Sequence, residues 1–441
     1  MTQRNPADQP LREALEALER SAPDAPVPHP ALVHRRPRWQ LMLAPTVVTL
    51  AVGILIGSLG TQWLLEARSS ALPTSSPQPS PTTASQAPAS AIPSAAVGRF
   101  AWSTSPFEQG ALATSIAYID HRWIVTGSAD GPAAWWSDDG VLWTASRVET
   151  ASRNDRVASM GPVASVGSSL ISLGWWGPAT GEDRVEGTYA WVSRDHGVSW
   201  QQTEAPPFGA AVTSGPAGLV AVPGWTGCCN ETGPQALTAR SDDGTTWQRI
   251  AADPVFADAA LNSIAADSGG YVAVGGTWDP GSPGAGTSAA AWWSDDGEHW
   301  QRAAIDDAGD TSSDITQVVA GPNGFVAIGV YSGGTGPYAT VIWTSPDGRT
   351  WQAQRLAEAG FPNGLLLGSD GVHLVAMGSS GGRVTAWTSS DGLAWTDEPV
   401  PQDLYPGDLA MGDGRVIAVA NCGPTTDCFA DILVTGSLRS R

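Results

Sequence analysis

The sequence has no lysine: its 23 basic residues are all arginines, against 43 acidic residues. From residue 98 onward there are 16 arginines and 37 acidic residues, which gives a net charge of −21. A surface this acidic repels phosphate backbones, and the sequence contains no concentrated basic patch. The composition therefore excludes nucleic acid as a partner.

Charge is missing altogether from residues 41–65, an apolar run of 25 positions. A helix needs only about 20 apolar residues to cross a bilayer. Arg35, Arg36 and Arg38 precede the run, and this positive bias predicts a cytoplasmic N-terminus. A cleaved signal peptide is the alternative, but its apolar region would be only about 7–15 residues long. We therefore expect an uncleaved, single-pass transmembrane signal-anchor helix in the cell membrane, with the following chain on the extracytoplasmic side.

Two segments flank the expected membrane helix. Residues 1–40 form the predicted cytoplasmic tail, in which leucines at helical spacing predict a short amphipathic helix over residues 11–20. That helix could dock a cytoplasmic partner, although a weakly helical tail without a specific role is an equal alternative. Residues 66–97 are dominated by Pro, Ser, Thr and Ala, a composition that predicts a linker between the membrane and the next domain.

A short motif, Ser-x-Asp-Gly-x-x-Trp, recurs through the remaining chain. Five copies have this form, and a sixth, Ser193–Trp200, has one extra residue between the Asp and the Gly. The serines of successive copies are 44 to 56 residues apart, so the chain has a repeat architecture. The aspartates of the six copies are Asp139, Asp195, Asp243, Asp296, Asp347 and Asp391.

Each repeat contains four short segments rich in Val, Ile and Trp and interrupted by Gly, Asp or Pro. This pattern predicts four antiparallel strands, which at about 50 residues per repeat is typical of a β-propeller blade. A parallel β-helix fits less well, because its rungs are shorter. Residues 98–441 have room for seven blades, although only six carry the motif. We expect an all-β, seven-bladed propeller whose last blade is closed by pairing residues 98–105 with residues 430–437.

The motif resembles the Asp-box, also called the bacterial neuraminidase repeat, of the sialidase-like propellers, and the copy at Ser193–Trp200 matches that pattern in full. The resemblance implies that the boxes join the third and fourth strands of each blade, on the face opposite the binding site. Their residue types also suit a turn, since Asp accepts backbone N–H groups and Gly permits positive φ. Catalysis or metal binding by the box carboxylates is the alternative interpretation.

A binding site is therefore expected on the opposite face, in the loops between second and third strands and at the starts of the first strands. Aromatic side chains in or beside those loops are candidate ligand contacts, although some could simply pack the loops. These aromatic residues are Trp175, Trp176, Trp225, Trp278 and Tyr331. Polar residues at the strand starts could instead cap their own turns or converge on Ca²⁺ or a polyol. These polar residues are Asp155, Asn262, Asp314, Asn363 and Asp408, with Arg156 beside the first.

Four cysteines lie in two of these loops, and an extracytoplasmic location permits disulfides. Four cysteines allow three pairings. The third and seventh blades lie far apart in a ring, whereas bridged Cα atoms come within about 7 Å. We therefore predict local pairs, Cys422 with Cys428 and Cys228 with Cys229.

The resemblance to sialidases implies an arginine cluster, a tyrosine nucleophile with a glutamate, and an aspartate. The early Arg-Ile-Pro motif of that family is absent from this sequence. Fold alone does not carry function. The sequence therefore favours a binding module for a carbohydrate or protein ligand, with no cofactor other than the Ca²⁺ considered above. A sialidase-like exo-glycosidase and a non-catalytic envelope scaffold or assembly factor are the alternatives.

Overall fold

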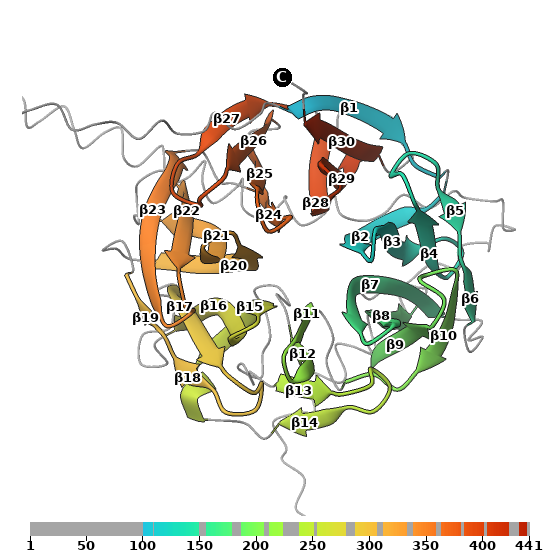
Figure 1. Ribbon diagram of the computed structural model, residues 1–441, viewed down its shortest axis with the longest axis horizontal. Coiled ribbons are helices and arrows are strands. Elements are labelled where there is room, and N and C mark those ends of the chain that lie inside the picture. The colour runs from blue at the N-terminus through green and yellow to red at the C-terminus, as the bar shows by residue number, and fades with distance from the viewer. Residues whose placement is uncertain are drawn as a thin grey trace, which may run out of the picture. The chain divides into compact units, whose positions relative to one another are not determined.

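The computed structural model describes one all-β unit within residues 100–438 (Figure 1). The predicted tail, membrane segment and linker, residues 1–97, lie outside the described residues, as does the loop with Cys228 and Cys229. No helix in the described part of the chain is long and apolar enough to cross a membrane. The internal positions that are not described are 109, 150–155, 179–186, 207–210, 224–237, 251–253, 279–286, 307–311, 333–337, 359–362, 381–382, 401–403 and 423–431.

Seven separate sheets follow one another around a ring, so the predicted seven-bladed propeller is confirmed (Figure 1). In each sheet, consecutive strands pair antiparallel from the ring's centre outward. Blade 1 contains β2 (Leu112–Ile119), β3 (Arg122–Ser128), β4 (Pro132–Ser137) and β5 (Thr144–Ala145). Blade 2 contains β7 (Arg156–Val166), β8 (Ser169–Pro178), β9 (Gly187–Ser193) and β10 (Ser199–Thr203). Blade 3 contains β11 (Ala211–Gly215), β12 (Gly218–Val222), β13 (Thr238–Ser241) and β14 (Gln248–Ile250).

The remaining blades repeat this order. A 3₁₀ turn, η3 (Pro254–Phe256), precedes blade 4, which contains β15 (Ala259–Asp267), β16 (Gly270–Trp278), β17 (Thr287–Ser294) and β18 (Gln301–Arg302). Blade 5 contains β20 (Ser312–Gly321), β21 (Gly324–Ser332), β22 (Tyr338–Ser345) and β23 (Thr350–Glu358). Blade 6 contains β24 (Asn363–Ser369), β25 (Leu374–Ser380), β26 (Arg383–Ser389) and β27 (Thr396–Pro399). Two short strands, β6 (Arg147–Glu149) and β19 (Ala304–Ile305), pair parallel with β10 and β23 of the next blade.

Blade 7 is built from both ends of the propeller sequence. It contains β28 (Leu404–Gly412), β29 (Arg415–Cys422) and β30 (Ile432–Leu438), and its outer strand is β1 (Phe100–Pro106). β1 pairs antiparallel with β30 from Phe100 opposite Leu438 to Pro106 opposite Ile432. The predicted closure of the ring is confirmed, and it removes the unpaired edge that β30 would otherwise present.

The core consists of seven buried apolar clusters, each formed by the facing sides of two adjacent blades. Between blades 4 and 5, for example, Val274 and Trp343 are fully buried in one such cluster. Every sheet is therefore packed on both faces, which explains why its strands are apolar at successive positions rather than at alternate ones. The edges of the inner strands and the loops at the two ends of the strands therefore remain available to form a binding site.

Candidate functional site

The six box turns lie on one face of the propeller, between the third and fourth strands of blades 1 to 6. In each box the serine hydroxyl accepts the glycine N–H at 2.8–2.9 Å. Each box aspartate accepts backbone N–H groups that follow the glycine, as Asp243 does from Thr245 and Thr246 at 2.8 Å. The box glycines have φ between +68° and +88°, which only glycine adopts without strain.

These turn contacts favour the ionised form of five box carboxylates, those of Asp139, Asp195, Asp243, Asp296 and Asp391, whose pKa values are lowered. The two backbone N–H donors lower the pKa of Asp243 far below its ordinary value. For Asp296, partial burial opposes the shift, but hydrogen bonds from the backbone and side chain of His299 still lower the pKa strongly. The box aspartates therefore act as acceptors that hold their own turn, which fits the structural role implied by the resemblance.

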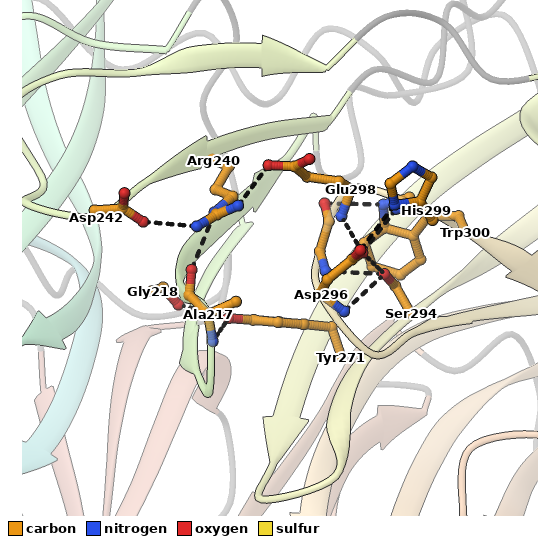
Figure 2. Close-up of polar contacts among 11 residues, drawn as sticks. Ala217, Gly218, Arg240, Asp242, Tyr271, Ser294, Asp296, Glu298, His299 and Trp300 are labelled. Carbon is orange, nitrogen blue, oxygen red and sulfur yellow. Dashed lines mark hydrogen bonds and ion pairs between the residues drawn. The ribbon is translucent and has the colours of Figure 1, made fainter.

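Arginines connect neighbouring box turns across the blade boundaries. Figure 2 shows Arg240 of blade 3 with Asp242 at 2.8 Å, with Glu298 of blade 4, and with the carbonyl oxygen of Ala217 at 3.1 Å. Tyr271 of blade 4 completes this boundary, since its hydroxyl donates to Gly218 and accepts the Ala217 N–H, both at 2.9 Å. The Arg240 guanidinium and the Tyr271 hydroxyl thus both join blade 3 to blade 4.

Two further boundaries use the same device. Arg122 donates to Asp138 at 2.8 Å within blade 1 and to the carbonyl oxygen of His196 in blade 2 at 3.3 Å. Arg349 of blade 5 pairs with Asp295 of blade 4 at 3.2 Å, and its guanidinium lies 4.1 Å from the centroid of Trp293. Three arginines of this face, Arg122, Arg240 and Arg349, thus join adjacent blades.

Toward the face opposite the box turns, the inner strands of blades 4 and 5 bring together Asn262 and Asp314. The Nδ2 of Asn262 donates to Oδ1 of Asp314 at 3.0 Å and to the carbonyl oxygen of Ile315 at 2.8 Å. The Oδ1 atom of Asn262 is buried and has no hydrogen-bond partner among the described residues. A buried acceptor left in this state costs about 1–3 kcal/mol, so this position favours an additional donor.

Asp314 lies in a setting unlike that of the box carboxylates. Burial raises its pKa to about 7, and hydrogen bonds from Asn262 and the Ile315 N–H offset that effect only in part. A glycine makes room for this carboxyl group, because a Cβ on Gly276 would lie 2.9 Å from Asp314 Oδ1. The half-buried Trp278 follows Gly276 by two positions on β16, on the same side of the strand. We call Asn262, Asp314, Gly276 and Trp278 the blade 4/5 cluster.

The polar residues predicted at the starts of the inner strands do not form one ring of equivalent positions. Each of these strands carries a β-bulge, and Asn262 is the bulged residue of β15. Asp314 lies two residues before the bulge of β20, and Asp408 lies one residue after the bulge of β28. Because these three residues lie at different offsets from the bulge, they do not occupy equivalent positions of their strands.

Instead of meeting at one central point, these side chains pair between adjacent blades. Asp408 of blade 7 accepts the Ser115 hydroxyl of blade 1 at 2.7 Å and the Ile116 N–H at 3.0 Å. Burial raises the pKa of Asp408, although these hydrogen bonds oppose the effect. Within the described chain, no group of three or more His, Cys, Asp or Glu side chains could hold a metal ion.

The candidate aromatic residues differ in exposure. Trp175 is exposed on β8, and Trp278 is half-buried. Tyr331 is buried, with the Arg355 guanidinium 4.5 Å from its ring centroid, so it packs the scaffold of blade 5. The remaining candidates lie outside the described residues or have side chains that are not described. They are Asp155, Arg156, Trp176, Trp225, Asn363, Cys422 and Cys428.

Three residues of this region were not found from the sequence. Ser115 is the partner of Asp408, Gly276 accommodates Asp314, and Arg355 covers Tyr331. The Gly275–Gly276 pair in the middle of an otherwise apolar strand is a signal for close approach of another group. Ser115 and Arg355 carry no such signal, because their contacts depend on how adjacent blades are aligned.

The sequence matches no protein-family model and no curated protein. Among solved structures, the phage phi92 endosialidase is similar with a TM-score of 0.46 and 12% identity, over 78% of this chain and 70% of that one. A GH74 xyloglucanase from Xanthomonas campestris gives a TM-score of 0.47 and 14% identity, over 74% and 53%. The Trypanosoma rangeli sialidase in complex with the inhibitor DANA gives 0.40 and 13%, over 76% and 57%. This chain thus spans little more than half of the last two proteins, and the similarity assigns no activity.

Proposed function

We propose that this protein is a membrane-anchored, extracytoplasmic binding module of the Asp-box type, whose propeller binds its ligand on the face opposite the box turns. The blade 4/5 cluster carries the proposal. It combines a carboxyl group with a pKa of about 7, an amide oxygen without a partner and a half-buried tryptophan. Binding sites typically combine a few convergent polar groups with an aromatic surface and ionisable groups of shifted pKa.

A carbohydrate is the ligand class that this chemistry favours. Sugar hydroxyl groups donate hydrogen bonds to a carboxylate or amide oxygen, and the apolar face of a sugar ring packs on an indole. Trp278 supplies the indole, and Asp314 supplies the acceptor. A protein ligand would use the same tryptophan as a buried anchor.

Binding of the full-length protein to a glycan array tests this proposal. We expect Trp278→Ala to weaken binding to any glycan found on the array at least tenfold. Trp293→Ala is the matched control, because Trp293 is also half-buried but contacts Arg349 of the box face. Equal losses in the two variants would contradict a site on blades 4 and 5.

Hydrolysis separates the enzyme alternative from the binding module. Incubation of the protein with a fluorogenic sialoside should release no fluorophore. Turnover that is abolished by Arg156→Ala would instead support a sialidase-like exo-glycosidase. The hydroxyl of Tyr271 is no candidate for the nucleophile, because it is held between Ala217 and Gly218 on the box face.

The proposed topology is tested with reporter fusions. Alkaline phosphatase, which folds only outside the cytoplasm, should be active when fused after residue 441 and inactive when fused before residue 1. The reverse result would overturn the proposed orientation of residues 41–65.

A further inference from the structure

Exposed apolar side chains occur in turns on the box face of blades 1, 2 and 6. Seven large apolar side chains are exposed in the described part of the chain, and five of them lie in turns of this face. Leu142 has 76% of its surface exposed and Leu393 has 56%. Leu393 directly follows the box glycine of blade 6, and Leu142 lies two positions after the box glycine of blade 1. We call these five residues the entry arc: Val141, Leu142, Val198, Val372 and Leu393.

The box turn itself does not require apolar residues at these positions. The two residues between the box glycine and tryptophan are Thr245 and Thr246 in blade 3, and Glu298 and His299 in blade 4. In those blades the same turn forms with the same hydrogen bonds. The turn therefore does not explain the exposed apolar side chains of blades 1, 2 and 6, and apolar side chains exposed on one face are a feature of contact sites.

The blades of the arc flank blade 7, in which the first and last strands of the propeller pair. Phe100 is opposite Leu438, so β1 begins and β30 ends at the box face of blade 7 (Figure 1). Blade 7 has no box turn there and packs between blades 6 and 1.

The charged side chains around the entry arc indicate which charge a partner would carry. The N–H groups of Leu142 and Val141 lower the pKa of Asp139, and those of His373 and Val372 lower the pKa of Asp370 despite its partial burial. These carboxylates are consequently ionised at neutral pH. In the described part of the chain, the turns of blades 6, 7, 1 and 2 hold seven aspartates, against four arginines at or beside them. The aspartates are Asp120, Asp138, Asp139, Asp195, Asp370, Asp391 and Asp413, and the arginines are Arg122, Arg147, Arg194 and Arg415.

We propose that the entry arc is a docking surface for a protein segment that carries both apolar and basic side chains. The apolar residues of the segment cover the exposed leucines and valines, and its basic residues meet the surrounding carboxylates. A second copy of this face would bring aspartates against aspartates, and an anionic membrane would be repelled in the same way. This surface is separate from the proposed ligand site on blades 4 and 5, so either proposal can fail alone.

Binding of designed peptides to the full-length protein in phosphatidylcholine nanodiscs tests the proposal, with empty nanodiscs subtracted. The probe is a labelled 15-residue amphipathic peptide of Leu and Lys, and its comparison peptide replaces every Leu with Ser at equal charge. Fluorescence anisotropy should show binding of the Leu/Lys peptide and at least tenfold weaker binding of the Ser/Lys peptide. A double variant, Leu142→Ser with Leu393→Ser, should weaken binding of the Leu/Lys peptide at least tenfold.

The control variant is Thr246→Ser, which changes the position equivalent to Leu142 in a box outside the arc. It should bind the Leu/Lys peptide as the wild type does, and thermal melts should show that all variants are folded. Equal binding of the two peptides, or unchanged binding by the double variant, would overturn the proposal, since only net charge would then attract the peptide. Concentration-dependent self-association that the double variant abolishes would overturn it in favour of a second copy.

Discussion

Aspartates occur in two contrasting settings in this propeller. On the box face, Asp243 and Asp296 accept backbone N–H groups, and their pKa values are strongly lowered. On the inner strands, Asp314 and Asp408 are enclosed between blades, and burial raises their pKa values. The same side chain therefore fixes a turn as an ionised acceptor in one region, whereas burial favours its neutral form in the other.

Substituting a box glycine should give the largest effect on the structural side of this comparison. In Gly244→Ala the new Cβ would lie 2.2 Å from Cδ1 and 2.3 Å from Cγ1 of the buried Ile171, at a φ of +72°. We expect a loss of about 3 kcal/mol or more in the free energy of unfolding, from backbone strain and overpacking together. Urea denaturation measures this loss.

Gly167→Ala is the matched control for that substitution. Gly167 has a φ of +57° in the turn between β7 and β8, but a Cβ there would meet no atom within 4 Å. It should cost only about 1 kcal/mol, because strain acts alone. Equal costs for the two variants would mean that the box glycine serves only the backbone conformation and not the packing of blade 2 against blade 3.

Asp314→Asn tests the other setting through the pH dependence of stability. The pKa of Asp314 is about 7 in the folded protein and 3.8 ordinarily, so the folded state keeps a proton that the unfolded chain releases. Wild-type stability should therefore fall by a few kcal/mol as the pH rises from about 4 to about 7. The Asp314→Asn variant should lack the part of the pH dependence of stability that comes from Asp314. Asp408 still contributes to the pH dependence in both proteins.

Urea denaturation of both proteins at pH values from 4 to 8 measures the difference in slope. Asp243 and Asp296 do not interfere, because their lowered pKa values place their loss of stability below about pH 4, as the pH falls. Parallel curves for wild type and Asp314→Asn would show that Asp314 is ionised in the folded protein, and the contrast between the two settings would not hold.

Much of the fold could be predicted because its signals are local. A Ser, Asp, Gly and Trp at nearly fixed spacing define each box, and the spacing between boxes, set against the length of residues 98–441, gives the number of blades. Counting the strands of each blade also predicted the ring closure. Residues 98–105 were expected to pair with residues 430–437, and in the structure Phe100–Pro106 pairs with Ile432–Leu438. Hydrogen bonds within a turn depend on neighbouring residues, which the sequence displays directly.

The candidate site could be predicted only in part, because it depends on how adjacent blades are aligned. Asn262 and Asp314 were both identified, but their hydrogen bond to each other was not. The reason is the β-bulge at Asn262, since one extra residue redirects the side chains that follow and leaves no mark in the sequence pattern. The pairing of Asp408 with Ser115 went unseen for the same reason.

Asp243→Ala should have a smaller effect than the box glycine. The variant loses the acceptor for the N–H groups of Thr245 and Thr246, which we expect to cost about 1–2 kcal/mol, as for a lost helix cap. Asp242→Ala is the control, because its carboxylate is exposed and forms an ion pair with Arg240. It should cost less than about 1 kcal/mol in the same denaturation experiment. A larger loss for Asp242→Ala would mean that the ion pairs, rather than the turn, hold the box.

The weakest contribution to the box face should come from the ion pair between Arg240 and Glu298. Both side chains are partly exposed, with 24% and 32% of their surfaces accessible, so solvent screens their attraction. A double-mutant cycle with Arg240→Gln and Glu298→Gln should give a coupling free energy below about 1 kcal/mol, which decreases as salt is added. Arg240 also donates to the carbonyl oxygen of Ala217, so Arg240→Gln alone should cost more than Glu298→Gln alone. A coupling above about 2 kcal/mol, insensitive to salt, would show that the boundary between blades 3 and 4 depends on this ion pair rather than on its buried apolar cluster.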